Sequence, residues 1–287
     1  MNKPEWISKK FYKDNEIEKL LDKNLLNSVC EAANCPNKWE CFRKKTATFM
    51  ILGNKCTRGC RFCAVDKDIG GENLNSNEPI KIAEVVKKIG LKHVVITSVT
   101  RDDLKDQGAA HFKKTIEEIR KISDATIEVL IPDFNGKKEL IDIVIDAKPD
   151  VINHNIETVE NLHKKIKPIG SYETSIELLN YVKERDKNII TKSGIMLGFG
   201  ETIDELADSV EDLKDISCDI LTIGQYLRPS EKHIKVSEYI TDEKFIMYKR
   251  LALKIGIPVV ESGRFIRSSY NAIDSIKKLM NKIKGEL

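Results

Sequence analysis

The sequence predicts an α/β fold with parallel strands, arranged as a partial (β/α)6 barrel. Short β-rich runs alternate with amphipathic helical patterns about six times along the chain, and such an alternation builds a parallel sheet. Right-handed crossovers between successive parallel strands favour a partial barrel, although the pattern alone also permits a doubly wound open sheet. In a barrel, the loops that follow the strands line the place where ligands bind.

The first strand–helix unit shows the pattern most clearly. The apolar run TFMILG (48–53) ends at a loop rich in cysteine. The helix expected at 81–90 has apolar residues at i, i+3, i+4 and i+7 and a stop signal at Gly90. Farther along, Thr202 and Glu205 have the spacing of a capping box, which predicts a helix start. Further strands are expected at 93–99, 126–134, 150–157, 189–200, 220–226 and 258–263. Helical patterns lie around 112–119, 140–147, 178–182, 203–213 and 245–252, and a last helix follows residue 263.

Composition restricts the possible functions. The chain has 287 residues, of which 41% are hydrophobic and 32% charged, so it can bury a sizeable core. A net charge of +3 lacks the concentrated basic excess of a general nucleic-acid binder. The segment MNKPEWISKKFYKDNEIEKL has no apolar stretch typical of a secretory signal, and no apolar run is long enough to span a membrane. We therefore expect a cytoplasmic location, with no nucleic-acid partner and no membrane partner.

Six of the seven cysteines fall into two triplets. They are Cys30, Cys35 and Cys41, spaced C-x4-C-x5-C, and Cys56, Cys60 and Cys63, spaced C-x3-C-x2-C. Because cytoplasmic thiols are kept reduced, metal ligation is favoured over disulfides. Structural zinc needs four closed ligands, often from paired C-x2-C knuckles, and neither triplet matches that pattern. A 4Fe–4S cube held by three cysteines leaves one iron open to a substrate or cofactor.

Several motifs resemble those of one known family. The C-x3-C-x2-C spacing with Phe62 before the last cysteine is similar to the signature of radical S-adenosylmethionine enzymes. Together with the second triplet and later motifs, the chain resembles the lipoyl synthase family from residue 30 to residue 272. The matching motifs are CEAANCPNKWEC, CTRGCRFCAV, TSVTRDDL, NHNIETV, TKSGIMLGFGE, GQYLRPS and RSSYNA. The two triplets combined with RSSY carry the resemblance.

The resemblance implies a radical S-adenosylmethionine sulfurtransferase of lipoate biosynthesis. Such an enzyme inserts two sulfur atoms, at C6 and C8, into an octanoyl group held on a lysine of a lipoyl carrier protein domain. These C–H bonds are unactivated, so no side-chain base can remove the proton, and the cofactor must supply a carbon radical. The family uses one 4Fe–4S cluster to cleave S-adenosylmethionine and an auxiliary 4Fe–4S cluster as sulfur donor. An electron donor such as flavodoxin or ferredoxin is implied as a further partner.

The resemblance also assigns the cluster ligands. It implies that Cys56, Cys60 and Cys63 hold the radical-generating cluster and that Cys30, Cys35 and Cys41 hold the auxiliary one. The fourth auxiliary ligand would be a serine of RSSY. From the sequence, Ser268 and Ser269 both qualify, and capping of the last helix is the alternative role. The family pattern selects Ser269, which is then also a catalytic residue.

The domain organisation follows from these assignments. We expect an N-terminal extension with the auxiliary-cluster cysteines at 1–47 and the partial barrel at 48–257. A C-terminal extension with RSSY is expected at 258–287. Both extensions are expected to cover the barrel mouth.

Polar residues at the predicted strand ends are the candidates for S-adenosylmethionine binding. They are Thr97 and Ser98 in the second strand, Asn153, Asn155 and Glu157 in the fourth, Lys192 and Ser193 in the fifth, and Gln225 in the sixth. A structural hydrogen bond is the alternative role for each of them. His154 is expected to point into packing, and Cys218 to be a thiol outside any site.

Two other functions remain open from the sequence. A biotin synthase-like sulfur inserter would keep the C-x3-C-x2-C triplet but would leave the upstream triplet and RSSY unexplained. A non-catalytic zinc-binding interaction protein belongs to a different class. Colour separates the two classes, because an iron–sulfur protein purified without oxygen is brown and a zinc protein is colourless.

Overall fold

The structure, a computed structural model of the whole chain, describes residues 4–7, 16–33, 35–43, 48–68 and 73–285. The chain folds as two compact units. The N-terminal unit comprises Lys9–Gly59 and Cys63–Ile152, and the C-terminal unit comprises Met1–Ser8, Cys60–Phe62 and Asn153–Leu287. Eight strands belong to the main sheet, and β3 (Lys55–Cys56) and β4 (Asp66–Lys67) form a separate parallel pair.

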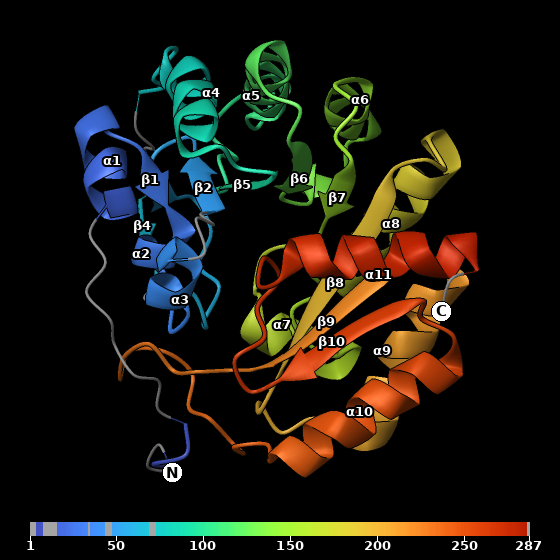
Figure 1. Cartoon of the computed structure of the whole chain (residues 1–287). Coiled ribbons are helices and arrows are strands. Elements are labelled where there is room, and N and C mark those ends of the chain that lie inside the picture. The colour runs from blue at the N-terminus through green and yellow to red at the C-terminus, as the bar shows by residue number, and fades with distance from the viewer. Residues whose placement is uncertain (1–3, 8–15, 34, 44–47, 69–72, 286–287) are drawn as a thin grey trace. The chain divides into compact units, whose positions relative to one another are not determined.

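In the N-terminal unit the strands are ordered β1-β2-β5-β6-β7. Their bounds are β1 (Asn27–Ser28), β2 (Thr48–Ile51), β5 (His93–Ser98), β6 (Thr126–Leu130) and β7 (Val151–Asn153), whose last residue falls in the other unit. Strand β1 is antiparallel to β2, whereas β2, β5 and β6 are parallel. The helices are α1 (Glu16–Asn24), α2 (Val29–Ala32), α3 (Lys38–Arg43), α4 (Glu78–Ile89), α5 (Ala109–Ile122) and α6 (Lys138–Asp146), with a 3-10 turn at Phe134–Gly136. Helices α4, α5 and α6 lie next to one another along the strands (Figure 1).

The residues at the two ends of α4 explain where this helix begins and ends. Pro79 lies in the first turn, where a missing N–H costs nothing. Gly90 adopts a left-handed conformation with φ 71°, and its N–H donates to the carbonyl oxygens of Val86 and Lys87, which ends the helix. The apolar positions read from the sequence, such as Ile82 and Val86, are buried. The predicted helix is therefore confirmed.

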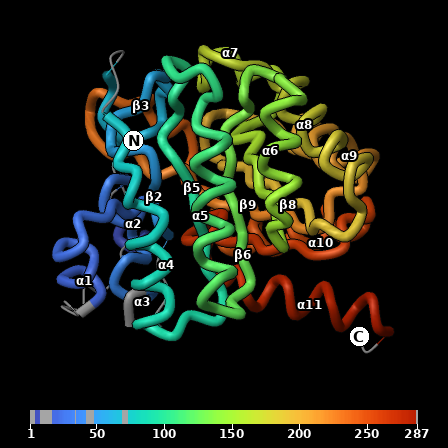
Figure 2. Tube along the Cα trace, turned by 90° about the horizontal axis from the view of Figure 1, so that it is seen from above, coloured from blue at the N-terminus to red at the C-terminus, as the bar shows by residue number. Residues whose placement is uncertain are grey.

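In the C-terminal unit, β8 (Ile190–Leu197), β9 (Ile220–Gln225) and β10 (Val259–Gly263) are parallel neighbours in this order. Its helices are α7 (Glu160–Ile166), α8 (Tyr172–Arg185), α9 (Ile203–Asp215), α10 (Asp242–Ile255) and α11 (Ala272–Lys284). The predicted capping box is present, since Thr202 accepts from the Glu205 N–H and Glu205 accepts from the Thr202 N–H. Helix α11 packs against β10, and Figure 2 shows it extending toward the C-terminus.

The structure contains every strand expected from the sequence, with some changes in length. The third and fourth strands are shorter than expected, because β6 ends at Leu130 and β7 at Asn153. The short helices α1, α2, α3 and α7 were not predicted. Among the described residues, no helix is both long enough and apolar enough to cross a membrane. The three-part division at residues 47 and 257 stays a prediction.

Candidate active site

The cysteine loop that follows β2 is fixed on its N-terminal side by backbone and hydroxyl hydrogen bonds. The Thr57 N–H donates to the Thr100 carbonyl at 3.0 Å, and its hydroxyl donates to the same oxygen. That hydroxyl also accepts from the Asp102 N–H at 3.1 Å. The Arg58 N–H donates to Cys56 Sγ at 3.4 Å. These bonds attach the start of the loop to the segment after β5.

Arg58 is a buried residue between two of the predicted cluster ligands. Its guanidinium donates to both carboxylate oxygens of Asp102 at 2.8 and 2.9 Å, to Asp133 at 2.5 Å and to Asn135 at 2.8 Å. Burial opposes the positive charge, but the bonds to Asp102 and Asp133 outweigh it and raise the pKa of Arg58. Burial would raise the pKa of Asp102, yet the bond from Arg58 holds it below its usual value.

The C-terminal part of the same loop, Cys60–Phe62, makes a different set of contacts within its own unit. The Arg61 N–H donates to the Ile166 carbonyl at 2.9 Å, and the Arg61 carbonyl accepts from Ile234 at 3.1 Å. Phe62 packs against a buried cluster of Ile166, Phe199, Tyr226 and Val236. The loop is therefore held by charge at one end and by apolar packing at the other.

The upstream cysteines lie on and between two short helices. Cys30 is a buried residue of α2, whereas Cys35 and Cys41 are half-buried. The Cys35 N–H donates to the Cys30 carbonyl at 3.1 Å. Burial and the neighbouring charge of Cys35 raise the pKa of the Cys30 thiol to about 12, and the charge of Cys41 adds to this.

Polar contacts among α1, α2 and α3 hold this triplet in place. Lys38 of α3 forms ion pairs with Glu18 of α1 at 2.6 Å and Glu31 of α2 at 2.9 Å. Ser28 caps the N-terminus of helix α2, where its hydroxyl accepts from the Glu31 N–H. Strand β1 supports the same helix through a two-residue pairing with β2.

The two triplets suit iron–sulfur cubes chemically. Thiolate sulfur is the preferred ligand of iron in such clusters, and a cube takes each thiolate on a different iron. Five of the six thiol residues are half-buried. Across the described part of the chain, no three His, Cys, Asp or Glu side chains are grouped to hold one metal ion. A cube does not require its ligands to converge on a single point, so the donor sets fit it.

Four of the strand-end candidates lie where they were expected. Thr97 and Ser98 end β5, Asn153 ends β7 and Gln225 ends β9. Lys192 does not lie at an end, because it is the third residue of β8, fully inside the strand, and Ser193 follows it there. The expected position of these two residues at the strand end was wrong, because both lie in the middle of β8, whereas a cofactor contact from Lys192 stays a prediction.

Hydrogen bonding separates these candidates further. The Gln225 side-chain nitrogen lies within hydrogen-bond distance of the Leu197, Tyr226 and Glu238 carbonyl oxygens, and its oxygen accepts from the Ile240 N–H, so its bonding capacity is used within the fold. In contrast, Ser98 Oγ and Asn155 Oδ1 are buried oxygens without a hydrogen-bond partner among the described residues. Because buried polar atoms are normally satisfied, these two oxygens fit ligand contacts better than Gln225 does.

Asn155, Glu157 and Ser268 form a polar cluster in the C-terminal unit. The Asn155 amide donates to Ser268 Oγ at 2.9 Å and to Glu157 at 3.2 Å. Burial raises the pKa of Glu157 to about 7, although the charge of Lys167 and the Asn155 bond oppose the rise. Glu157 also has a left-handed backbone with φ 69°, a strained conformation that is enriched at functional sites.

The turn before RSSY lies very close to β9. A methyl group added at Gly224 would lie 2.3 Å from the Ile266 carbonyl oxygen, so only glycine permits this approach. The turn brings Ser268 to Asn155, and the neighbouring Ser269 is half-buried.

His154 and Cys218 were expected to lie outside the site, and the structure places both of them outside it. His154 is buried, and its Nε2 lies 3.1 Å from Ser175 Oγ on α8, which confirms that it points into packing. Cys218 is buried beside the Ile220 carbonyl, and burial together with Asp219 raises its pKa to about 12.

The sequence did not single out Arg58, Asp102 or Asp133. The one sequence signal that could have indicated Arg58 is its position, as a charged residue between the expected ligands Cys56 and Cys60.

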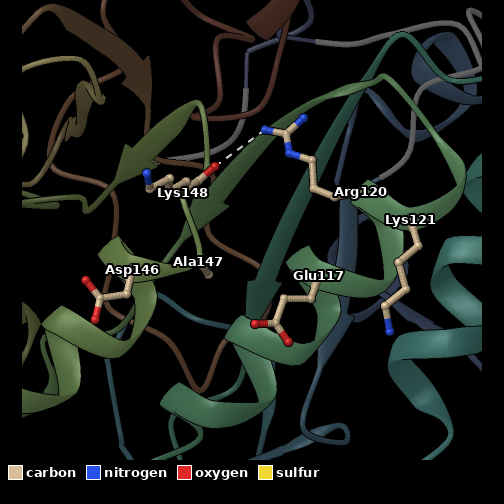
Figure 3. A pocket seen from close by; sticks show the side chains of 6 residues that line it. All are labelled: Glu117, Arg120, Lys121, Asp146, Ala147 and Lys148. Carbon is tan, nitrogen blue, oxygen red and sulfur yellow. Dashed lines mark hydrogen bonds between the residues drawn. The ribbon is translucent and has the colours of Figure 1, made fainter.

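A polar hollow lies at the C-terminal ends of α5 and α6. Its lining residues are Glu117, Arg120, Lys121, Asp146, Ala147 and Lys148 (Figure 3). Arg120 donates to the Lys148 carbonyl at 3.5 Å and pairs with Asp150, which also accepts from the Ile127 N–H. None of the predicted site residues lines this hollow.

Comparison with known proteins decides the family. The Radical SAM superfamily profile matches residues 50–213. A lipoyl synthase from Caldanaerobacter subterraneus subsp. tengcongensis is 53% identical over 274 residues, which cover 95% of this chain and 96% of that protein. The chain belongs to the lipoyl synthase family of radical S-adenosylmethionine enzymes. A lipoyl synthase from Alkaliphilus metalliredigens is 51% identical, over 96% of both chains.

The fold agrees with this family. The crystal structure of methylornithine synthase superposes with a TM-score of 0.56 at 14% identity, covering 96% of this chain and 90% of that one. The predicted α/β fold of the partial-barrel type is confirmed, as are the resemblance and the enzyme class. Membership in the family makes 4Fe–4S clusters and S-adenosylmethionine the cofactors of this chain.

Proposed function

We propose that this chain inserts two sulfur atoms, at C6 and C8, into a protein-bound octanoyl-lysine and thereby forms the lipoyl group. The observation that carries the proposal is similarity to a lipoyl synthase over 95% of the chain, in a sequence that contains two cysteine triplets. When bound, S-adenosylmethionine and its cluster supply a 5′-deoxyadenosyl radical for hydrogen abstraction. The protein's own part is to hold both clusters, orient the octanoyl chain and exclude competing reactions.

Cys56, Cys60 and Cys63 are proposed to hold the cluster that cleaves S-adenosylmethionine. All three are half-buried and lie on one loop that hydrogen bonds and packing hold at both ends. Three ligands on one short loop can bind three corners of a cube and leave the fourth iron open. This arrangement supports binding of the cofactor at that iron.

Cys30, Cys35, Cys41 and Ser269 are proposed to hold the auxiliary cluster, which donates the sulfur. Ser269 is favoured over Ser268 because the Ser268 hydroxyl is engaged by Asn155. A serine oxygen is a harder and poorer ligand for cluster iron than a thiolate. Its bond is therefore a suitable place for this cluster to open during sulfur transfer.

The finer assignments also belong to this proposal. The S-adenosylmethionine contacts are assigned to Thr97, Ser98, Asn153, Asn155, Glu157, Lys192 and Gln225. Ser98 and Asn155 have the strongest support, since each has an unsatisfied buried oxygen. The partners are an octanoylated lipoyl carrier protein domain and a reductant such as flavodoxin or ferredoxin. The location is the cytoplasm, with no nucleic-acid or membrane partner.

A direct reaction tests the proposal. The reconstituted protein is incubated without oxygen with an octanoyl-lysine peptide, S-adenosylmethionine and a reductant, and the peptide is analysed by mass spectrometry. We expect a product with two added sulfur atoms and about eight irons per chain, since each cube holds four. S-adenosylmethionine cleavage without any sulfur in the peptide would support the superfamily but contradict the proposed reaction.

A further inference from the structure

We propose that Arg58 is a positioning residue that, with Asp102 and Asp133, holds the first turn of the cysteine loop in its cluster-binding conformation. This inference rests on the proposed function, because it takes Cys56, Cys60 and Cys63 as cluster ligands. We call Arg58, Asp102, Asp133 and Asn135 the arginine clamp.

The clamp joins segments that are far apart in the sequence. Arg58 lies between Cys56 and Cys60, Asp102 follows β5 and Asp133 follows β6. The Arg58 side chain is 3% exposed and that of Asp133 is fully buried. The guanidinium therefore fixes one turn of the loop against the ends of two parallel strands of the N-terminal unit.

The acceptors of the clamp are themselves held in place. Asp133 Oδ1 accepts from the Asn135 N–H at 2.9 Å, which leaves its Oδ2 directed at Arg58. Asp102 Oδ1 also accepts from the Asn135 side chain at 3.1 Å, and its Oδ2 lies 3.2 Å from the Thr57 hydroxyl oxygen. The carboxylates that accept from the guanidinium are therefore each oriented by further hydrogen bonds.

The clamp acts on the cluster ligands through the backbone. Because the Arg58 N–H donates to Cys56 Sγ at 3.4 Å, fixing the side chain also fixes the direction of this N–H and of the sulfur. Outer-shell groups that orient metal ligands contribute strongly to metal retention. The arginine clamp has this role for the turn from Cys56 to Gly59.

A guanidinium is required for this geometry. Three carboxylate contacts and one amide contact need a planar group with several fixed donors, and the single ammonium group of lysine cannot reproduce them. Replacing Asp133 by asparagine keeps its shape but leaves Arg58 with one less buried negative partner. Both changes should loosen the loop without altering any cysteine.

The test measures iron release rather than activity. The background protein carries Cys30→Ala, Cys35→Ala and Cys41→Ala, so that it holds only the cluster of the second triplet. Arg58→Lys, Asp133→Asn and Asp102→Asn are made in this background, and iron transfer to a chelator is followed without oxygen. Arg120→Lys is the matched control, because Arg120 also pairs with a carboxylate of this unit but lines the hollow at the ends of α5 and α6 (Figure 3).

We expect Arg58→Lys, Asp102→Asn and Asp133→Asn each to release iron about tenfold faster than the background protein, because losing an outer-shell contact typically weakens metal affinity by at least about tenfold. Arg120→Lys should release it at the background rate. The electron paramagnetic resonance signal of the reduced cluster should broaden or shift in the Arg58, Asp102 and Asp133 variants and stay unchanged in Arg120→Lys. Equal release and unchanged signals in the Arg58, Asp102 and Asp133 variants would overturn the clamp.

Circular dichroism melting of each variant guards against a general folding defect. If Arg58→Lys is unfolded, the isosteric Asp102→Asn and Asp133→Asn variants decide, since each keeps part of the clamp. If the background protein itself binds no iron, the ligand assignment under the proposed function fails, which is distinct from failure of the clamp.

Discussion

The two cysteine triplets are held by very different structures. Around Cys56, the arginine clamp has an Arg58 side chain that is only 3% exposed and two carboxylates in direct contact. Around Cys30, the links among the short helices depend on Lys38, whose side chain is 16% exposed and whose partners Glu18 and Glu31 are more exposed still. Partly exposed ion pairs contribute little stability, whereas removing one partner of a buried pair is costly.

This difference matches the proposed roles of the two clusters. The radical-generating cluster must survive each turnover, so its loop benefits from a rigid support. In the proposed function the auxiliary cluster gives up sulfur, and a weakly supported triplet would tolerate its disassembly. The comparison predicts which changes have large effects and which have small ones.

The largest effect is expected from the second triplet. Replacing Cys56, Cys60 and Cys63 by alanine should reduce S-adenosylmethionine cleavage to background, because the cluster that delivers the electron has lost its protein ligands. Chromatography of 5′-deoxyadenosine measures this. Cys218→Ala is the matched control and should cleave at the normal rate, since Cys218 is buried beside Ile220 and outside the site.

Ser269→Ala should nearly abolish the lipoyl product under single-turnover conditions while S-adenosylmethionine cleavage persists. The reason is that the auxiliary cluster would lose the ligand at which it opens. Ser268→Ala is the matched control and should be milder, because its hydroxyl accepts from Asn155 and the proposed ligand is Ser269. A normal lipoyl yield from Ser269→Ala together with no product from Ser268→Ala would show that Ser268 is the ligand. Normal yields from both variants would show that neither serine is needed as a ligand.

Gly224→Ala should destabilise the C-terminal unit by about 1–3 kcal/mol, the usual cost of overpacking. The added methyl would lie 2.3 Å from the Ile266 carbonyl and would push the RSSY turn away from β9. Thermal unfolding measures the stability, and the lipoyl yield should fall together with it. An unchanged melting temperature would show that the turn is not held against Gly224.

Lys38→Met should have the smallest effect, about 0–1 kcal/mol, because its ion pairs are partly exposed. The variant should nevertheless lose iron faster from the upstream triplet than from the second triplet, since Lys38 links all three short helices. Iron release from proteins that retain only one triplet measures this. Equal acceleration at both triplets would contradict the separation of the two supports.

The sequence predicted the repeating architecture well because its signals are local. Gly90 and the Thr202–Glu205 pair mark helix ends within a few residues, and apolar spacing identifies the buried faces. The arginine clamp could not be predicted in this way, since Arg58 and Asp133 are brought together only by the order of the strands. The Gln225 side chain is fully hydrogen-bonded by backbone groups that follow the strand, such as the Ile240 N–H, and no sequence pattern indicates these bonds.

The most direct test of the division of labour is a measurement on the upstream triplet. A protein with Cys30→Ala, Cys35→Ala and Cys41→Ala is incubated without oxygen with the octanoyl-lysine peptide, S-adenosylmethionine and reductant. Formation of 5′-deoxyadenosine and of lipoyl peptide is measured in the same sample. We predict that 5′-deoxyadenosine still forms and that no sulfur enters the peptide. Lipoyl peptide from this variant would contradict the assignment of the upstream triplet as the sulfur donor site.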